Sequence, residues 1–139
     1  MTDKTHTSAK FQRGLATRKA VLGAEYVEKS IADADDFSWP MQQLTTEYCW
    51  DEIWNRPGLP HPVRRMLVLA ITVTAGRWDE FKLHMQAALR SGDLTQDEIK
   101  EVLLQCAVYA GVPSANHAFR EAREVLGSMA AAKKPKLRK

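Results

Sequence analysis

The chain has 139 residues, of which 45% are hydrophobic, and its formal net charge is +3. The last seven residues, KKPKLRK, hold five of its twenty lysines and arginines and no acid, so residues 1–132 carry fifteen basic and seventeen acidic residues. This distribution predicts one compact domain over residues 1–132 and a disordered basic tail over residues 133–139. It argues against a nucleic-acid-binding protein, because the body of the chain has no excess of positive charge.

The cysteines and the hydropathy of the chain indicate its compartment. Cys49 and Cys106 are far apart and form no C-x-x-C pair, which is typical of a cytoplasmic protein. The first twenty residues lack the apolar stretch of a signal peptide, and no apolar run approaches the roughly 20 residues that cross a membrane. A cytoplasmic protein without a membrane partner is therefore expected.

Apolar residues recur at helical spacing along almost the whole chain, and no segment combines alternating patterning with hairpin turns. The sequence therefore predicts an all-α bundle. Its first helical region should break at Gly23, and its second should end at the proline-rich loop NRPGLPHP. These two regions are expected at residues 8–34 and 40–54.

The second half of the chain predicts four more helices. Pro62 suits the first turn of a helix that runs to a bend at Gly76. Thr95 and Glu98 form a T-x-x-E capping box for a helix that ends at Gly111. The other two helices are expected at residues 79–89 and 114–126.

The helix that begins at Pro62 contains the run MLVLAITVTA, residues 66–75. Such a run is too apolar to leave a face in water. We therefore expect this helix in the centre of the bundle or in an interface between subunits.

Glu80 and His84 are four residues apart and so share one face of the fourth helix. A carboxylate one turn before an imidazole can orient it and favour its protonated form, which suits a proton donor or a partner for an oxyanion. The alternative is an exposed pair that stabilises the helix by about 0.2–0.5 kcal/mol. Spacing alone favours the exposed pair.

Arg64 and Arg65 lie at a helix start, where the helix dipole disfavours cations. Their guanidinium groups can bind carboxylates through paired hydrogen bonds. The pattern therefore allows two partners: a small polyanion, or an acidic patch on a neighbouring subunit.

Other chemistries have weaker sequence support. The four histidines fall in no zinc-binding pattern, and no phosphate-binding glycine loop is present, so neither a metal nor another cofactor is expected. Cys106 lies on an apolar helix face and is interpreted as core packing, whereas Cys49 stays ambiguous. Trp54, four residues after Trp50, is more typical of a core or interface than of a ligand platform.

These residues fall within motifs that resemble the carboxymuconolactone decarboxylase family. The similarity runs from about Arg18 to Leu126 and consists of RKAVLGAEYVEKS, DEIWNRPGLP, EFKLHMQAALRSG, DEIKEVLLQCAVYAGVP and SANHAF, in the family's order. It is closer to the 4-carboxymuconolactone decarboxylases than to the peroxidase-like branch. The peroxidase-like branch carries the motif C-x-x-C-x-x-x-H. When the histidine of this motif is aligned with His84, its two cysteine positions are occupied by Arg77 and Glu80. A glutamate that precedes the motif in that branch is replaced here by Arg65.

The resemblance implies an alkylhydroperoxidase-D-like helical fold assembled into an oligomeric ring, a trimer or hexamer. It implies cofactor-free decarboxylation of a small anionic lactone, 4-carboxymuconolactone, to 3-oxoadipate enol-lactone in protocatechuate degradation. His84 would then be the proton donor or enolate partner, Glu80 its orienting carboxylate, and Arg64 and Arg65 the substrate anchors. The remaining substrate-binding candidates are Trp54 and Met85, near the leaving carboxylate, and Asn116, for which a structural role at a helix start is the preferred interpretation.

Two alternatives stay open at this stage. A thiol peroxidase-like redox protein of the same fold would need Cys49 and Cys106 to meet in space. A noncatalytic helical oligomer would use the fold as a binding module.

Overall fold

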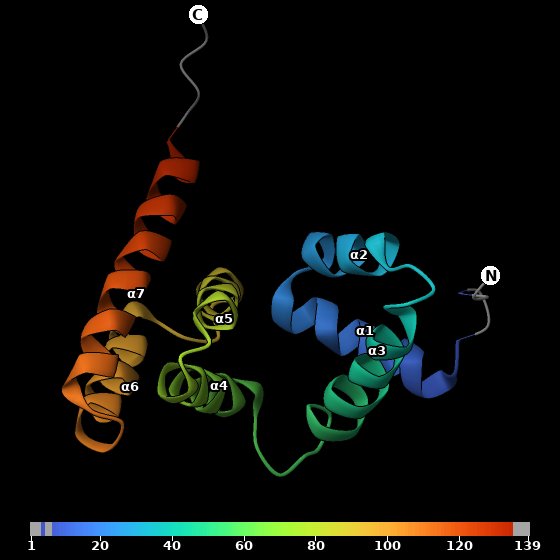
Figure 1. The fold of residues 1–139 in the computed structure, drawn as a ribbon, viewed down its shortest axis with the longest axis horizontal. Coiled ribbons are helices and arrows are strands. Elements are labelled where there is room, and N and C mark those ends of the chain that lie inside the picture. The colour runs from blue at the N-terminus through green and yellow to red at the C-terminus, as the bar shows by residue number, and fades with distance from the viewer. Residues whose placement is uncertain (1–3, 5–6, 135–139) are drawn as a thin grey trace, which may run out of the picture. The chain divides into compact units, whose positions relative to one another are not determined.

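A computed structural model describes residue 4 and residues 7–134, and these residues form helices and no strand. The all-α prediction is confirmed. The chain divides into two compact units between His61 and Pro62, and each is described by itself below; the single domain expected over residues 1–132 stays a prediction. Figure 1 shows the helices. In order they are α1 (Ala9–Leu22), α2 (Ala24–Asp33), α3 (Trp39–Leu44), η1 (Thr45–Ile53), α4 (His61–Ala75), α5 (Trp78–Ser91), α6 (Gln96–Tyr109) and α7 (Val112–Lys133).

The first helical region breaks where the sequence predicts. Ser8 caps α1, since its hydroxyl oxygen accepts a hydrogen bond from the Phe11 amide at 3.0 Å. Gly23 separates α1 from α2 with a φ of 98°, which a residue with a side chain rarely adopts. The break therefore depends on glycine.

The second helical region differs from the single α-helix expected over residues 40–54. Only α3 is α-helical, and η1 continues it as a π-helix, closed at its end by a hydrogen bond from the Trp54 amide to the Cys49 carbonyl at 3.0 Å. In a π-helix the hydrogen bonds join residues five apart, where an α-helix joins residues four apart. Trp50 and Trp54 stack with ring centroids 5.1 Å apart. The spacing of apolar residues in the sequence does not distinguish a π-helix from an α-helix over this segment.

In the first unit, α1 packs closely along η1 (Figure 1). Gly14 faces the π-helix, and a Cβ atom added there would lie 2.0 Å from the carbonyl oxygen of Thr46. Beside this contact, the Arg13 guanidinium donates two hydrogen bonds to the Asp51 carboxylate, from Nε at 3.1 Å and from Nη2 at 3.0 Å. A residue without a side chain therefore sets the spacing of the two helices.

Gly14→Ala should lower the free energy of unfolding by about 1–3 kcal/mol, because the added methyl group would meet backbone that has no rotamer to move. Ala16→Gly is a matched control, since Ala16 lies on the exposed face of the same helix and its replacement should cost only about 1 kcal/mol through helix propensity. Urea unfolding of both variants measures the difference. An unchanged free energy of unfolding in Gly14→Ala would contradict this prediction, because it would show that α1 and η1 can move apart without loss of stability.

The second unit contains α4 to α7 around one hydrophobic core, with α6 and α7 side by side in tan and orange in Figure 1. The predicted capping box of α6 is confirmed, because the Thr95 hydroxyl accepts from the Glu98 amide and the Glu98 carboxylate accepts from the Thr95 amide. The fully buried core side chains that all four helices supply include Leu69, Phe81, Met85, Leu103 and Ala118.

Helix α7 is longer than predicted, since it continues past Leu126 to Lys133. Leu126 and Met129 pack against the core and extend the buried face by another turn. Lys133 is therefore helical and not part of a disordered tail, and residues 135–139 lie outside the described residues. None of the helices in the described part of the chain is long and apolar enough to cross a membrane.

Helix α4 does leave an apolar face uncovered within this chain. Leu69 and Val73 lie in the core, but Ile71 is 63% exposed and Leu67 47% exposed. The interpretation that this helix has no exposed face is therefore wrong for the chain taken alone. The other expectation, that α4 lies in an interface where another subunit covers this face, stays a prediction.

Candidate active site

His84 lies in the middle of α5, a helix with favourable ends. Asp79 and Glu80 place negative charge in the first turn, and Gly92 ends the helix in the left-handed conformation. Because the helix also buries Phe81 and Met85, the intervening His84 is held partly buried beside the core. The position of the imidazole is thus fixed by packing on both sides of it.

The electrostatic setting of His84 favours the neutral imidazole. Burial, with a smaller effect from the positive charge of Arg65, lowers the pKa of His84 to about 4, although Glu80 acts in the opposite direction. Glu80 thus favours the protonated form, as its spacing predicts, but burial outweighs it and His84 is uncharged at neutral pH. Desolvation outweighs the carboxylate because Glu80 is exposed, where water screens its charge.

Arg65 lies on α4 and is the largest fully buried side chain of the described residues, at 1% exposure. Its Nε donates a hydrogen bond to Oδ2 of Asp93 at 2.7 Å, and the Asp93 side chain is 31% exposed. The sequence predicts that Arg65 binds a small polyanion or an acidic patch on another subunit. In the structure Arg65 pairs with Asp93 of its own chain. Arg64, the neighbouring residue on α4, is half-buried.

The structure brings together only part of the predicted site. The charges of Arg65 and Glu80 both lie close enough to His84 to shift its pKa. Met85 is 1% exposed and packs into the hydrophobic core of this chain, and its predicted contact with the leaving carboxylate stays a prediction.

The other two candidates, Trp54 and Asn116, belong to other segments of the chain. Trp54 belongs to the first unit, where it is buried, stacks on Trp50 and meets the edge of His61 at a centroid distance of 5.5 Å. Asn116 is exposed in α7, whose N-cap residue is Gly111, so its interpretation as a helix-start amide is wrong. Trp54 thus forms an aromatic cluster with Trp50 and His61, and its spacing from Trp50 is consistent with this role in the core.

Sequence reasoning missed Asp93, which follows Gly92 directly after the end of α5. In the structure the left-handed Gly92 turns the chain so that Asp93 reaches the buried Arg65. Two sequence features point to the Arg65–Asp93 pair. Asp93 follows a helix-ending glycine, and Arg65 is a cation within a largely apolar helix.

A second polar cluster, joining α5 to α7, was also missed. His117 stacks on Trp78 with ring centroids 4.0 Å apart and planes 3° apart. Its Nε2 lies 3.1 Å from Oε1 of Glu121, which also pairs with Lys82 at 2.9 Å. His117 and Glu121 are four residues apart, as Glu80 and His84 are, so the same spacing rule could have predicted this pair.

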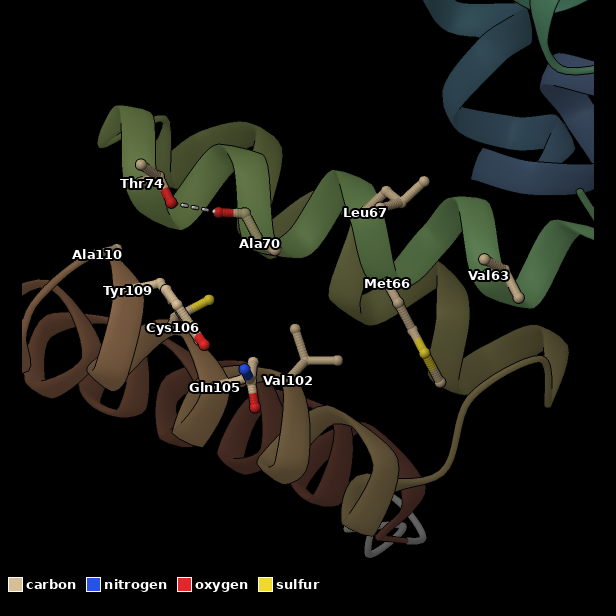
Figure 2. A pocket seen from close by; sticks show the side chains of 10 residues that line it. All are labelled: Val63, Met66, Leu67, Ala70, Thr74, Val102, Gln105, Cys106, Tyr109 and Ala110. Carbon is tan, nitrogen blue, oxygen red and sulfur yellow. Dashed lines mark hydrogen bonds between the residues drawn. The ribbon is translucent and has the colours of Figure 1, made fainter.

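The second unit has an apolar groove of about 570 Å³ between α4 and α6, shown in Figure 2. Met66 and Val102 extend into the space between the two helices, and the hydroxyl of Thr74 donates to the Ala70 carbonyl at 2.8 Å. No charged side chain lines the groove, and it contains none of the predicted site residues. A dicarboxylate would find no cation there, so the groove suits apolar protein surface better than the substrate.

Both cysteines are free thiols. Burial raises the pKa of the Cys106 thiol, which disfavours the thiolate that disulfide exchange requires. Among residues 7–134, no three histidine, cysteine or acidic side chains are grouped so that they could hold a metal ion.

The lowered pKa of His84 predicts a pH effect on stability. The unfolded chain, with an ordinary histidine pKa near 6.5, binds a proton that the folded chain does not. The contribution of His84 is therefore complete above about pH 6.5 and is lost as the pH falls toward 4. Between pH 7 and 4.5 the wild type should lose about 2 kcal/mol more unfolding free energy than His84→Gln in urea titrations. An equal loss in both proteins would contradict the buried neutral imidazole.

The sequence comparisons assign the family. A model of the carboxymuconolactone decarboxylase family matches residues 40–124, more than half of the chain. The chain belongs to this family. The similarity first indicated by its motifs is thereby confirmed, and the match includes α4, α5 and α6, with His84, Arg65 and Asp93.

Two curated relatives carry the comparison further. The chain is 38% identical to a 4-carboxymuconolactone decarboxylase of Acinetobacter baylyi over 84% of its own length and 86% of the relative's. It is 39% identical to a nitrosuccinic acid decarboxylase of Metarhizium robertsii over 86% of its own length and 82% of the relative's. Both relatives are decarboxylases, which supports a decarboxylase function for this member of the carboxymuconolactone decarboxylase family.

Proposed function

We propose that the chain is a carboxy-lyase that converts 4-carboxymuconolactone to 3-oxoadipate enol-lactone without a cofactor. The observation that carries the proposal is the partly buried, neutral His84 beside the buried cation Arg65. The 38% identity to a decarboxylase of this lactone supports the choice of substrate. The noncatalytic module and the peroxidase are less well supported, because both named relatives are decarboxylases.

The substrate supplies its own electron sink. When the bond to the departing carboxylate breaks, its electron pair moves through the adjacent C=C bond to the lactone carbonyl and forms an extended enolate, and a proton then adds to the ring carbon next to that carbonyl. The protein has to hold the leaving carboxylate in line with the π system and stabilise the enolate oxygen. One well-aimed hydrogen-bond donor at that oxygen contributes about 3–4 kcal/mol.

The neutral state of His84 supports one of the two roles that the sequence left open, the donor to the enolate oxygen. An imidazole with a pKa of about 4 is a poor reservoir of protons at neutral pH, but its N–H group still donates a hydrogen bond. We therefore assign His84 as the donor to the enolate oxygen. A bound dianion nearby would raise its pKa and strengthen that bond as charge develops.

The remaining residues of the proposal have supporting roles. Arg65, fixed by Asp93, places a buried positive charge near His84, and Arg64 on the same helix is the proposed anchor for the retained carboxylate. Glu80 is proposed to orient the imidazole. Trp54 and Asn116 stay proposed substrate contacts.

Nitrosuccinic acid is a second candidate substrate, favoured by the relative that is 39% identical. Its nitro group is attached to a carbon that also bears a carboxylate, so loss of CO₂ leaves the electron pair on a nitronate. The nitronate oxygen, like the enolate oxygen, needs a hydrogen-bond donor and no cofactor. The same His84 can therefore serve either reaction.

Released CO₂ and substrate loss should be measured with 4-carboxymuconolactone and with nitrosuccinate under the same conditions. We expect kcat/KM for the lactone to exceed that for nitrosuccinate by at least about tenfold, equivalent to about 1.4 kcal/mol of differential transition-state binding. The reverse ratio would assign the nitro acid as the substrate. No CO₂ from either compound would overturn the lactone assignment.

We further propose a homo-oligomer in which a second copy covers the groove between α4 and α6, as a trimeric or hexameric ring requires. Leu67 and Tyr109, which line the groove, and the exposed Ile71 of the same helix α4 support this partner, because an exposed apolar surface of this kind is unfavourable in water.

Ile71→Glu should shift the sedimentation coefficient to that of a smaller species, since a carboxylate would be buried in the interface. Thr74→Glu, at the groove's edge, should have a weaker effect. A wild-type chain that sediments as a monomer would contradict the assembly.

A further inference from the structure

Arg18 is a buried cation in the first unit. It lies on α1, is 7% exposed, and its Nη1 donates to Oε1 of Gln42 at 2.7 Å and to Oγ1 of Thr46 at 3.4 Å. Both acceptors are uncharged. Nε of Arg18 is buried and has no acceptor within the described part of the chain.

The carboxylates around α1 are taken by other cations. Arg13, one turn earlier, pairs with Asp51, and Lys19, the next residue, pairs with Glu28 at 2.9 Å. The groups that favour the charged form of Arg18 electrostatically are Tyr26 and Cys49, while burial, the largest effect, lowers its pKa. Arg18 thus keeps its charge in a place where no acid of the described chain compensates it.

This arrangement is unfavourable unless an anion completes it. A buried guanidinium without a counter-charge has lost its hydration and gained only two neutral hydrogen bonds. Nε has no acceptor, and both hydrogen bonds that the guanidinium makes in the described chain leave from Nη1, so Nε and Nη2 are the donors that a further ligand would use. Two parallel N–H groups on this edge of the guanidinium match the two oxygens of a carboxylate.

The chain contains an internal example of the same geometry. Arg13 uses Nε and Nη2 to bind Asp51 in a bidentate fashion at 3.1 and 3.0 Å. Arg18 presents the same edge of its guanidinium, at the boundary between α1 and the π-helix η1.

We propose that Arg18 is the receptor of a carboxylate-binding site in the first unit, and that its ligand is a small free carboxylate. The site would bind through the Nε and Nη2 edge while Gln42 and Thr46 hold Nη1 in place. The rival source of the same chemistry is an aspartate or glutamate of a second copy of the chain.

The test observes Arg18 itself and requires no turnover. In ¹H–¹⁵N spectra of the full chain, the arginine Nε resonance that Arg18→Met removes should shift saturably when succinate is added, and should not shift with chloride at equal ionic strength. Arg18→Lys, which keeps the charge but loses the fork, should weaken succinate binding, measured by calorimetry, at least about tenfold. Arg13→Met is the matched control and should bind succinate as the wild type does, because Asp51 already occupies Arg13.

Three outcomes would overturn the proposal. An Arg18 resonance that is insensitive to succinate would show that the edge is closed to free carboxylates. A resonance that instead moves with protein concentration, together with a smaller oligomer in Arg18→Met, would assign the partner to a second copy. A resonance that moves equally with chloride would show an adventitious ion only. None of these results depends on whether the chain decarboxylates a lactone.

Discussion

Replacing His84 with alanine should reduce turnover of 4-carboxymuconolactone at least about a hundredfold while the fold and the oligomer are kept. The loss follows from removal of the donor to the enolate oxygen, which is worth about 3–4 kcal/mol in comparable sites. The effect should appear mainly in kcat, because the interaction strengthens only as negative charge develops on that oxygen. Initial rates of lactone loss, with circular dichroism of the same samples, measure both quantities.

His117→Ala is the matched control for this prediction. His117 is a partly buried histidine of the same unit that is paired with Glu121 and stacked on Trp78, and it carries no proposed role in the reaction. Its loss should leave kcat within a few-fold of the wild type. Near wild-type turnover in His84→Ala, or equal losses in the two variants, would remove His84 from the mechanism.

Asp93→Ala should destabilise the chain by about 3–5 kcal/mol, the cost of leaving a buried cation without its partner. Arg65 is fully buried, so it cannot recover hydration when the carboxylate is lost. Arg65→Met should cost less, because Asp93 is partly exposed and water can solvate its carboxylate. Urea unfolding of the two single variants measures this asymmetry.

The double variant Arg65→Met with Asp93→Ala separates pairing from packing. Because methionine fills much of the space of arginine without a charge, the double variant should be more stable than Asp93→Ala alone. A double variant that is as unstable as the sum of the two single changes would show that Asp93 does not compensate Arg65. The account of the positive charge beside His84 would then fail.

Much of the helical architecture could be predicted from the sequence because its signals are local. The glycine at position 23, the Thr95 capping box and the apolar periodicity each act within a few residues of themselves. The π-helix η1 could not be predicted, because apolar spacing does not distinguish it from an α-helix, and neither could its close approach to Gly14, 32 residues before Thr46. The extension of α7 depends likewise on Leu126 and Met129 finding the core.

The candidate site could be predicted in residue identity but not in electrostatics. The motif around His84 indicates the histidine, and the family comparison agrees with the motif. Its protonation state depends mainly on burial and on Arg65, which comes from a different helix, so the spacing of Glu80, which raises the pKa of His84, does not predict the net lowering. Asp93 and Arg18 were missed for the same reason, since the burial of a charge is a property of the packed chain.

The most direct test of the central claim is to incubate chelator-treated wild-type chain with 4-carboxymuconolactone and to follow the lactone's ultraviolet absorbance together with released CO₂. The account predicts loss of absorbance with one CO₂ per lactone consumed, at a rate unchanged when metal ions are restored. Absorbance that stays constant at every pH between 6 and 8, or a loss without CO₂, would contradict it.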